Sequence, residues 1–354
     1  MKIFLLSLLA SLAFAAPDAS HSTGAGADIR AEWEQIADGE ALPWVYALAA
    51  DDHTLYAGGR GGLYISEDDG HAWRQTMEPG VRSLAISANH VYAGTANHGV
   101  FRSTDRGNTW ERINVGLPAQ LNGKRPAIQQ ILITNSGSLI ALTHDNGSFV
   151  SYNRGAVWHD QSDDWTVGVH YISREIRSMT EFDGYLWAYL STGWIVRALS
   201  ERTIWGSVKW FERGRITDWA VVNDELYAAG VRGFGRWNEV ELGWEYFGDG
   251  LPTGPYSPHV TTLAAHRGRI FAGLNGGGVY LFDERAERFI PAGLQDYIIG
   301  ALISHRSHLY ASTEQFANRK HTFEGIYRAS IPVVQPYGKA AATWGAIRQR
   351  HPFP

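Results

Sequence analysis

A five-residue pattern recurs along the whole chain and limits the folds open to it more than any other feature. The pattern is an apolar residue, an aromatic or apolar residue, and then one or two small residues, usually Ala and Gly. Its seven copies begin at Leu55, Val91, Leu139, Leu186, Leu226, Ile270 and Leu309. A Val or Ile stands 10 or 11 positions before each copy, with a polar or Gly-containing turn in between. This spacing predicts seven strand–turn–strand units.

Two more short strands are expected in each unit. The third strand is clearest where a Gly introduces it, in segments 62–66, 99–103, 278–282 and 325–329. An aromatic residue marks the start of the fourth strand: Trp73, Trp110, Trp158, Trp210, Trp244 and Phe289. Units of about 40 residues with four strands are typical of propeller blades. The sequence therefore predicts an all-β chain that folds as a single seven-bladed β-propeller.

The seventh unit lacks a fourth strand, and the amino end of the chain supplies a spare one. The segment led by Trp33 matches the missing strand, so we expect it to complete the last blade and close the ring. The predicted organisation is a signal peptide over 1–16, a flexible segment over 17–31, the propeller over 32–336 and a carboxyl-terminal tail over 337–354.

Targeting and composition restrict the partners of the protein. A basic start, an apolar run from Ile3 to Ala16 and a small-x-small site at Ala13–Ala15 predict a leader peptide, and hence a protein that is secreted or held in the secretory lumen. Asn146 begins a glycosylation sequon on an expected turn. There is no Cys, and the net charge of −5 argues against nucleic acid or, after leader cleavage, a membrane as the partner. The oligomeric state is left open.

Three segments resemble the Asp-box, Ser-x-Asp-x-Gly-x-x-Trp. They run from Ser66 to Trp73, from Ser103 to Trp110 and, with Asn in place of Asp, from Ser151 to Trp158. The resemblance implies a propeller in which the acidic residue holds a turn at the blade periphery, so Asp68 and Asp105 are not assigned to catalysis. Sialidases share this box, but their Phe/Tyr-Arg-Ile-Pro segment does not precede Ser66 here.

The first strand of each blade lines the centre of a propeller, so aligning these strands on their Val or Ile locates the candidate site. The residue three places later is apolar in every copy and is expected to be core. The residues next to the Val or Ile vary and include large polar groups. The predicted catalytic residues are Arg82, Arg177, Gln129 and Tyr46, and the predicted substrate contacts are Trp44, Trp219, His259, Thr217 and Thr261. Alternatively, the two arginines are solvated or paired with Glu175 and Asp218.

The leader, the length, the Asp-box-type blades, the lack of Cys and the aromatic-rich centre resemble the secreted fungal hetero-Diels–Alderases of tropolone-sesquiterpenoid biosynthesis. This resemblance implies a cofactor-free enzyme that joins a tropolone quinone methide to a humulene-type olefin. Its partner would be a small apolar or aromatic molecule. The histidines show no metal-ligand spacing, so no metal is expected. The alternatives are a lectin-like or protein-binding propeller and, less favoured, a glycoside hydrolase using Glu175 and Asp218.

Overall fold

The computed structural model describes residues 31–331 with short gaps at 88–89, 120–123, 162–163, 168–169, 173, 200–204, 254–258 and 318–319. The predicted leader, almost all of the predicted flexible segment and the predicted tail lie outside the described residues. Strands are the only regular elements in the described part of the chain. No helix of that part is long and apolar enough to cross a membrane.

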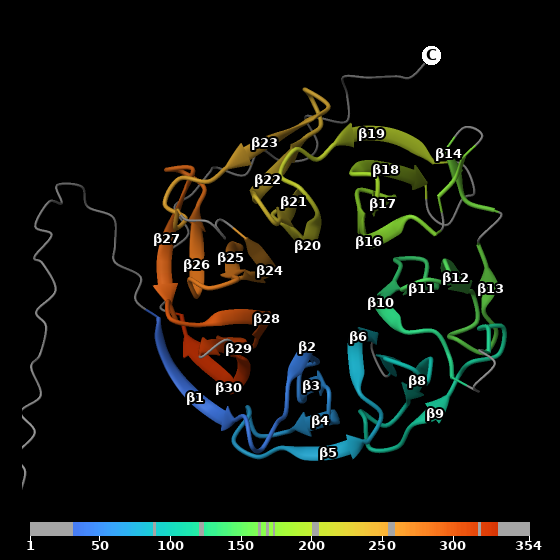
Figure 1. Ribbon diagram of the computed structural model, residues 1–354, viewed down its shortest axis with the longest axis horizontal. Coiled ribbons are helices and arrows are strands. Elements are labelled where there is room, and N and C mark those ends of the chain that lie inside the picture. Colours follow the sequence, from blue (N-terminus) through green and yellow to red (C-terminus); the bar gives the residue numbers. More distant parts are fainter. Residues whose placement is uncertain are drawn as a thin grey trace, which may run out of the picture.

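Seven four-stranded antiparallel sheets stand in a ring, as predicted (Figure 1). Blade 1 holds β2 (Val45–Ala50), β3 (Leu55–Gly59), β4 (Gly62–Ser66) and β5 (Arg74–Met77); blade 2 holds β6 (Val81–Ser87), β7 (His90–Thr95), β8 (Val100–Ser103) and β9 (Glu111–Arg112); blade 3 holds β10 (Ile128–Ile133), β11 (Leu139–Thr143), β12 (Ser148–Ser151) and β13 (His159–Asp160). The first strand of each blade is innermost.

The remaining blades follow the same plan. Blade 4 holds β16 (Ile176–Phe182), β17 (Tyr185–Leu190), β18 (Trp194–Leu199) and β19 (Gly206–Trp210); blade 5 holds β20 (Ile216–Val222), β21 (Glu225–Gly230), β22 (Gly233–Asn238) and β23 (Gly243–Phe247); blade 6 holds β24 (Val260–His266), β25 (Arg269–Leu274), β26 (Val279–Asp283) and β27 (Arg288–Gly293). The expected place of Trp210 was wrong, because this residue ends β19 instead of beginning it.

The amino-terminal strand closes the ring, which confirms the prediction made from Trp33. Blade 7 consists of β28 (Ile298–His305), β29 (His308–Ala317), β30 (Lys320–Ser330) and, at its outer edge, β1 (Glu32–Asp38). β1 runs antiparallel to β30, with Trp33 opposite Ala329. The indole Nε1 of Trp33 also donates a hydrogen bond to the carbonyl of Ala292 in blade 6. Both ends of the propeller are therefore held in one sheet, and that sheet is tied to its neighbour.

Small residues in the second strands let adjacent blades pack closely. A Cβ added to Gly58 would lie 2.6 Å from Cγ1 of Val81, the first residue of the next blade's inner strand. Gly94 stands in the same relation to Ile128, and Gly273 to Ile299. The recurring Ala and Gly positions therefore receive the recurring Val or Ile of the following blade, and these contacts form the core between blades.

The turns at the three Ser-led segments share one hydrogen-bond scheme. In the first, the Ser66 hydroxyl donates to Asp68 and accepts the backbone N–H of Gly70, while Asp68 accepts the N–H of Ala72. The turn places Asp69 and Gly70 at positive φ, 58° and 93°. Ser103–Asp105 and Ser151–Asn153 repeat the pattern. The side chains at these positions hold turns at the blade periphery.

Candidate functional site

Every inner strand carries a β-bulge at the same place. The pairing of first and second strands shifts by one residue immediately after the aligned Val or Ile in all seven blades. The bulged residues are Tyr46, Arg82, Gln129, Arg177, Thr217, Thr261 and Gly300. A bulge turns the side chain of the extra residue away from the regular pleat. These are the varied positions that the alignment had singled out, and they form a ring at the end of the molecule where the inner strands begin. We call them the bulge ring.

In blades 5 and 6 the side chain of the bulge residue is hydrogen-bonded to the next blade. The hydroxyl of Thr217 donates to the carbonyl of Val260 at 2.6 Å, and that of Thr261 donates to the carbonyl of Ile299 at 2.6 Å. Both acceptors are the aligned Val or Ile near the start of the neighbouring inner strand. These two hydroxyls, predicted as substrate contacts, therefore join blades, and in blades 5 and 6 the bulge side chain points across the seam.

In blades 1 to 3 the bulge side chains are large and free. Tyr46 is 44% exposed, Arg82 is exposed and Gln129 is half-buried. None of the three makes a side-chain hydrogen bond or ion pair within the described part of the chain. Three neighbouring blades thus present a phenol, a guanidinium and an amide with unused donors at one end of the ring.

Arg177 of blade 4 differs from Arg82. Its guanidinium turns back to its own segment, with Nη1 3.1 Å from the carbonyl oxygen of Arg174 and 3.5 Å from that of Ile176. Within residues 31–331 as described, no ion pair joins Arg82 or Arg177 to Glu175 or Asp218. The alternative of structural ion pairs is therefore not what holds these arginines.

The predicted aromatic and His contacts occupy three different settings. Trp44 precedes the bulge at a φ of 48°, and its carbonyl accepts the N–H of Arg60. Trp219 packs in the seam between blades 4 and 5, 6.1 Å from Trp244 between ring centres, and its Nε1 donates to Ser178. Trp219 therefore contributes to core packing, and Trp44 is the one that adjoins the bulge ring.

His259 lies just before the bulge of blade 6. Its Nδ1 is 3.1 Å from the amide nitrogen of Asn275. Burial, helped by the charge of Arg215, lowers the pKa of His259. The imidazole is therefore neutral near pH 7 and can accept or donate a hydrogen bond without adding charge.

A second set of polar residues, one place after the bulge, was largely missed by sequence reasoning. The Ser83 hydroxyl accepts the backbone N–H of Ile131, Gln130 accepts that of Met179, and Asp218 accepts that of Leu263. In each case the acceptor belongs to one blade and the N–H to the next. A polar residue two places after the Val or Ile was the available signal for this link.

Asp218 is the ionisable member of these links. Its carboxylate also accepts the Thr262 hydroxyl and the N–H of Trp219. Burial raises the pKa of Asp218 to about 6 despite these hydrogen bonds, which favour the charged form. Because Asp218 is committed to blade 6, it is poorly placed to pair with Glu175 as the two carboxyls of a glycosidase.

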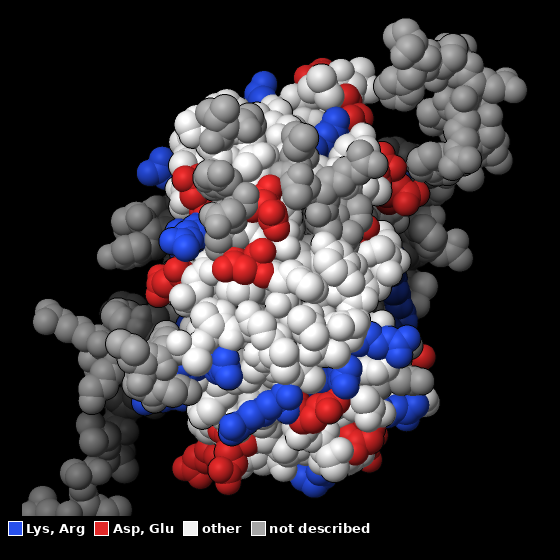
Figure 2. All heavy atoms as spheres, turned by 90° about the vertical axis from the view of Figure 1, so that its right-hand side faces the viewer, with Lys and Arg blue, Asp and Glu red and all other residues white. Residues whose placement is uncertain are grey.

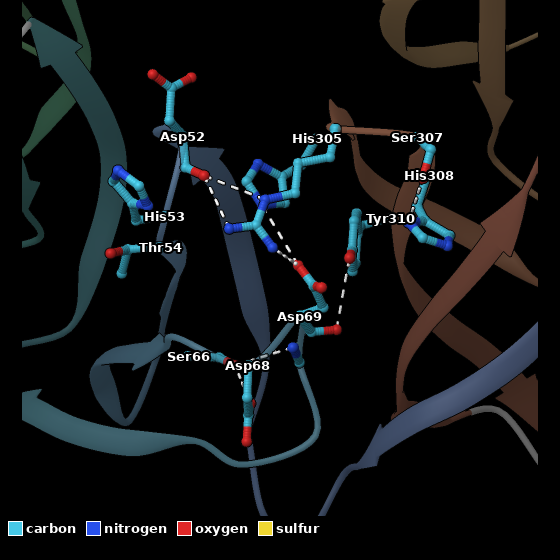
Figure 3. A network of polar contacts seen from close by, with 12 residues as sticks. Asp52, His53, Thr54, Ser66, Asp68, Asp69, His305, Ser307, His308 and Tyr310 are labelled. Atoms are coloured by element: carbon cyan, nitrogen blue, oxygen red, sulfur yellow. Dashed lines mark hydrogen bonds and ion pairs between the residues drawn. The ribbon is translucent and has the colours of Figure 1, made fainter.

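The histidines near the end of the chain belong to the closing seam (Figure 3). Arg306 donates to Asp69 at 2.8 Å and to the carbonyl of Asp52, so it joins blade 7 to blade 1. His305 is buried with Nε2 3.6 Å from Asp69. Burial, and the neighbouring charge of Arg306, lower the pKa of His305. Among the described residues, no group of three or more His, Asp or Glu side chains is arranged to hold a metal ion.

Two surface features are the distribution of charge on one side of the ring and the position of the glycosylation sequon. On the side of the ring that faces right in Figure 1, basic and acidic side chains alternate with uncharged surface, and the coloured residues show no continuous basic area (Figure 2). Asn146 lies half-buried in the turn between β11 and β12, as expected, and its backbone N–H donates to Thr143.

No family model matches the chain, and no curated protein matches its sequence. Solved propellers match its shape. YCF48 from Cyanidioschyzon merolae superposes with a TM-score of 0.59 at 16% identity over 85% of this chain and 98% of that one. YCF48 bound to D1 peptide gives 0.59 at 14% over 90% and 100%, and the WD40 β-propeller domain of Doa1 gives 0.57 at 11% over 84% and 96%. These likenesses establish the β-propeller fold.

Proposed function

We propose that the bulge ring binds and orients two small reactants, and that the protein is a hetero-Diels–Alderase that joins a tropolone quinone methide to a humulene-type sesquiterpene. One observation carries the proposal. Tyr46, Arg82 and Gln129 come from three successive blades, are all different, and have no partner among the described residues, although most polar side chains near the inner strands are tied.

The chemistry requires orientation and hydrogen-bond donors. In the cycloaddition one carbon–carbon and one carbon–oxygen bond form while three π bonds become one, so no group leaves and no external redox agent is consumed. Holding both reactants in contact can contribute about 7–11 kcal/mol to lowering the barrier. The Arg82 guanidinium and the Gln129 amide would donate to the quinone methide oxygen as it gains negative charge.

The other predicted residues take lesser parts in this proposal. Trp44 offers an aromatic face beside Tyr46 for the flat tropolone ring. Arg177 would act after releasing the carbonyls of its own segment. The side chains that join neighbouring blades would support the site by holding blades 4 to 7 in place; they are Thr217, Thr261 and Trp219. His259 would place a neutral imidazole at the rim of the site.

The test is a reaction of the purified protein with a quinone methide generated in solution and the humulene-type olefin. We expect a single stereoisomer of adduct, formed faster than in buffer. Equal rates and equal isomer ratios with and without the protein would overturn the assignment. A heat-unfolded sample serves as the control for surface effects.

The second candidate is a binding propeller without catalysis. It is favoured by one observation from the comparisons, since a propeller of this shape has been solved with a peptide bound. A lectin would be expected to repeat its binding residues in every blade, whereas the seven bulge positions hold five different residue types. Several equivalent hits on a glycan array, or tight binding of one peptide from a library, would favour this candidate.

Secretion completes the proposed function. The apolar leader would direct the chain to the secretory route, where Asn146 would be open to glycosylation in its turn. Expression in a eukaryotic host, followed by removal of N-linked glycans, should shift the electrophoretic mobility of the protein, and Asn146→Gln should abolish the shift. An unchanged mobility of the wild-type chain would count against modification at this residue.

A further inference from the structure

Blade 4 carries a hairpin that belongs to none of the seven sheets. Strands β14 (Thr166–Val167) and β15 (His170–Tyr171) pair only with each other among the described strands and stand between the last strand of blade 3 and the first of blade 4. The carbonyl of Thr166 accepts the backbone N–H of Trp205, and Ile172 donates its N–H to Trp165. The hairpin is therefore fastened to blade 4 as an added wall.

A cavity of about 500 Å³ lies between this hairpin and blade 4. This volume falls in the range of small-molecule pockets, about 300–1,000 Å³. Its apolar wall includes Ile172, Leu190 and Val196, which belong to the core between blades 3 and 4. Trp194, 44% exposed, stands at the rim and presents an indole ring.

Four polar side chains line this cavity, three of them exposed and one, that of Glu175, half-buried. His170, Glu175, Thr192 and Ser207 all line it. Within the described part of the chain, not one of the four makes a side-chain hydrogen bond or ion pair. Elsewhere the seams and turns use such groups to hold the fold. A half-buried carboxylate that has no partner among the described residues, beside an apolar wall, is what a ligand site offers.

The charge of the lining selects the kind of ligand. Glu175 is a half-buried carboxylate, and no Lys or Arg is among the described residues that line the cavity. An anion would be repelled, whereas a hydroxyl or amine would donate to Glu175 with a charge-assisted hydrogen bond. The apolar wall and Trp194 favour a hydrocarbon or ring system for the rest of the molecule.

One lining residue of the cavity lies close in sequence to the bulge of blade 4. Glu175 directly precedes Ile176 and Arg177, where the inner strand of blade 4 begins, so the carboxylate and the bulge lie at the same end of the ring. Most other lining residues belong to the hairpin or to β17, β18 and β19, so the cavity lies outward of the bulge ring.

We infer that this cavity is a binding site for a neutral or cationic apolar molecule that carries one hydrogen-bond donor, with Glu175 as the acceptor and Trp194 as the aromatic wall. The inference rests on the proposed function only for the identity of the ligand, which there would be a humulene-type reactant that bears a hydroxyl group.

The test uses two neutral fluorescent probes and no reaction. N-phenyl-1-naphthylamine carries an N–H donor, and 1-phenylnaphthalene has the same rings without it. We expect both to bind with increased fluorescence and the amine to bind more tightly. Trp194→Ala should weaken both by about 10-fold, since an aromatic wall is lost. Glu175→Gln should weaken only the amine, also by about 10-fold, since a charged acceptor is lost.

Trp210→Ala is the matched control. Trp210 is 47% exposed and contacts Trp194 edge-on, but it does not line the cavity, so this variant should bind both probes within about twofold of wild type. Thr192→Trp, at the exposed rim, should block both probes while leaving the thermal unfolding of the protein unchanged.

Equal effects of Trp194→Ala and Trp210→Ala, or equal effects of Glu175→Gln on both probes, would overturn the inference. The adduct assay is run separately on wild-type protein. If the probes fail to bind as expected but the adduct still forms, only the inferred site is overturned. If the probes bind as expected but no adduct forms, only the proposed function is overturned.

Discussion

The Asp218 carboxylate of blade 5 accepts the backbone N–H of Leu263 in blade 6, with Oδ2 2.8 Å from the nitrogen. The same carboxylate oxygen accepts the Thr262 hydroxyl, so one side chain holds two consecutive residues of the next inner strand. Ser83 and Gln130 make the equivalent link without a charge. Of these three hydrogen-bonded links between blades, the link between blades 5 and 6 is therefore the one that depends on pH.

The first prediction concerns that dependence. Burial raises the pKa of Asp218 to about 6 in the folded protein, above the usual value near 4. Between pH 4 and pH 6 the Asp218 carboxyl keeps its proton in the folded protein but has lost it in the unfolded chain. The contribution of the protonated carboxyl to the unfolding free energy is therefore complete below pH 4 and disappears as the pH rises through 6. Asp218→Asn is neutral throughout, and at pH 8 it should exceed wild type in unfolding free energy by up to about 3 kcal/mol.

The measurement is denaturant unfolding of both proteins between pH 4 and pH 8. The difference between their unfolding free energies should be small at pH 4 and grow with pH. Asp218→Ala is the control, because it also lacks the titrating group but leaves the N–H of Leu263 without an acceptor, so it should lie about 1–3 kcal/mol below Asp218→Asn at every pH. A difference between wild type and Asp218→Asn that stays constant with pH would contradict the prediction.

The second prediction concerns the space between blades 1 and 2. Gly58→Ala would place a Cβ 2.6 Å from Cγ1 of Val81 and should lower the unfolding free energy by about 1–3 kcal/mol. Gly248→Ala meets no atom within 4 Å and should change it by less than about 0.5 kcal/mol. Thermal and denaturant unfolding measure both.

A double variant sharpens this second test. Val81→Ala removes the methyl groups that the new Cβ would strike, so adding Gly58→Ala to it should cost less than adding Gly58→Ala to wild type. Strict additivity of the two changes would show that the two residues do not share the seam.

The third prediction distinguishes two kinds of bulge-ring side chain. Some have no partner among the described residues, and others are hydrogen-bonded to the next blade. Under the proposed function, Arg82→Met should slow adduct formation by about 100-fold, because it removes a donor to the developing oxyanion. Thr217→Val should instead lower the unfolding free energy by about 1 kcal/mol, because it removes the bond to the carbonyl of Val260. Arg60→Met, which removes another exposed arginine, is the control for the loss of charge.

Initial rates of adduct formation and unfolding free energies are measured for all three proteins. Equal rates for Arg82→Met and Arg60→Met would remove Arg82 from the site. A loss of rate in Thr217→Val without loss of stability would return Thr217 to the set of substrate contacts.

The fold was predictable from the sequence because the ring repeats its packing. A Val or Ile at the start of an inner strand packs against a small residue of the preceding blade at Gly58–Val81, Gly94–Ile128 and Gly273–Ile299, so the packing leaves a joint pattern in the sequence. The closing strand was predictable for the same reason, since Trp33 supplies what the seventh unit lacks. The sequence repeat can be recognised even where a single copy, such as the one at Leu186, matches the pattern poorly.

The site was predictable only in part. The alignment located the bulge ring, but whether a side chain is free depends on the distance across a seam, which a single sequence does not contain. Thr217 reaches the carbonyl of Val260, whereas Gln129 has no partner among the described residues. The β14–β15 hairpin was missed because two-residue strands carry no alternation of apolar and polar residues, and with it the cavity next to Glu175 was missed.

The last prediction concerns closure of the ring by β1. Trp33 packs against the core between blades 6 and 7, and its Nε1 is 2.8 Å from the carbonyl oxygen of Ala292. Trp33→Ala should lower the unfolding free energy by about 3 kcal/mol, through lost burial and packing. Trp33→Phe keeps an aromatic ring but removes the donor, so its cost should be nearer 1 kcal/mol. Trp210→Ala, at the exposed edge of blade 4, should cost less than either. If Trp33→Ala were no more destabilising than Trp210→Ala in denaturant unfolding, β1 would not be what holds the two ends of the propeller together.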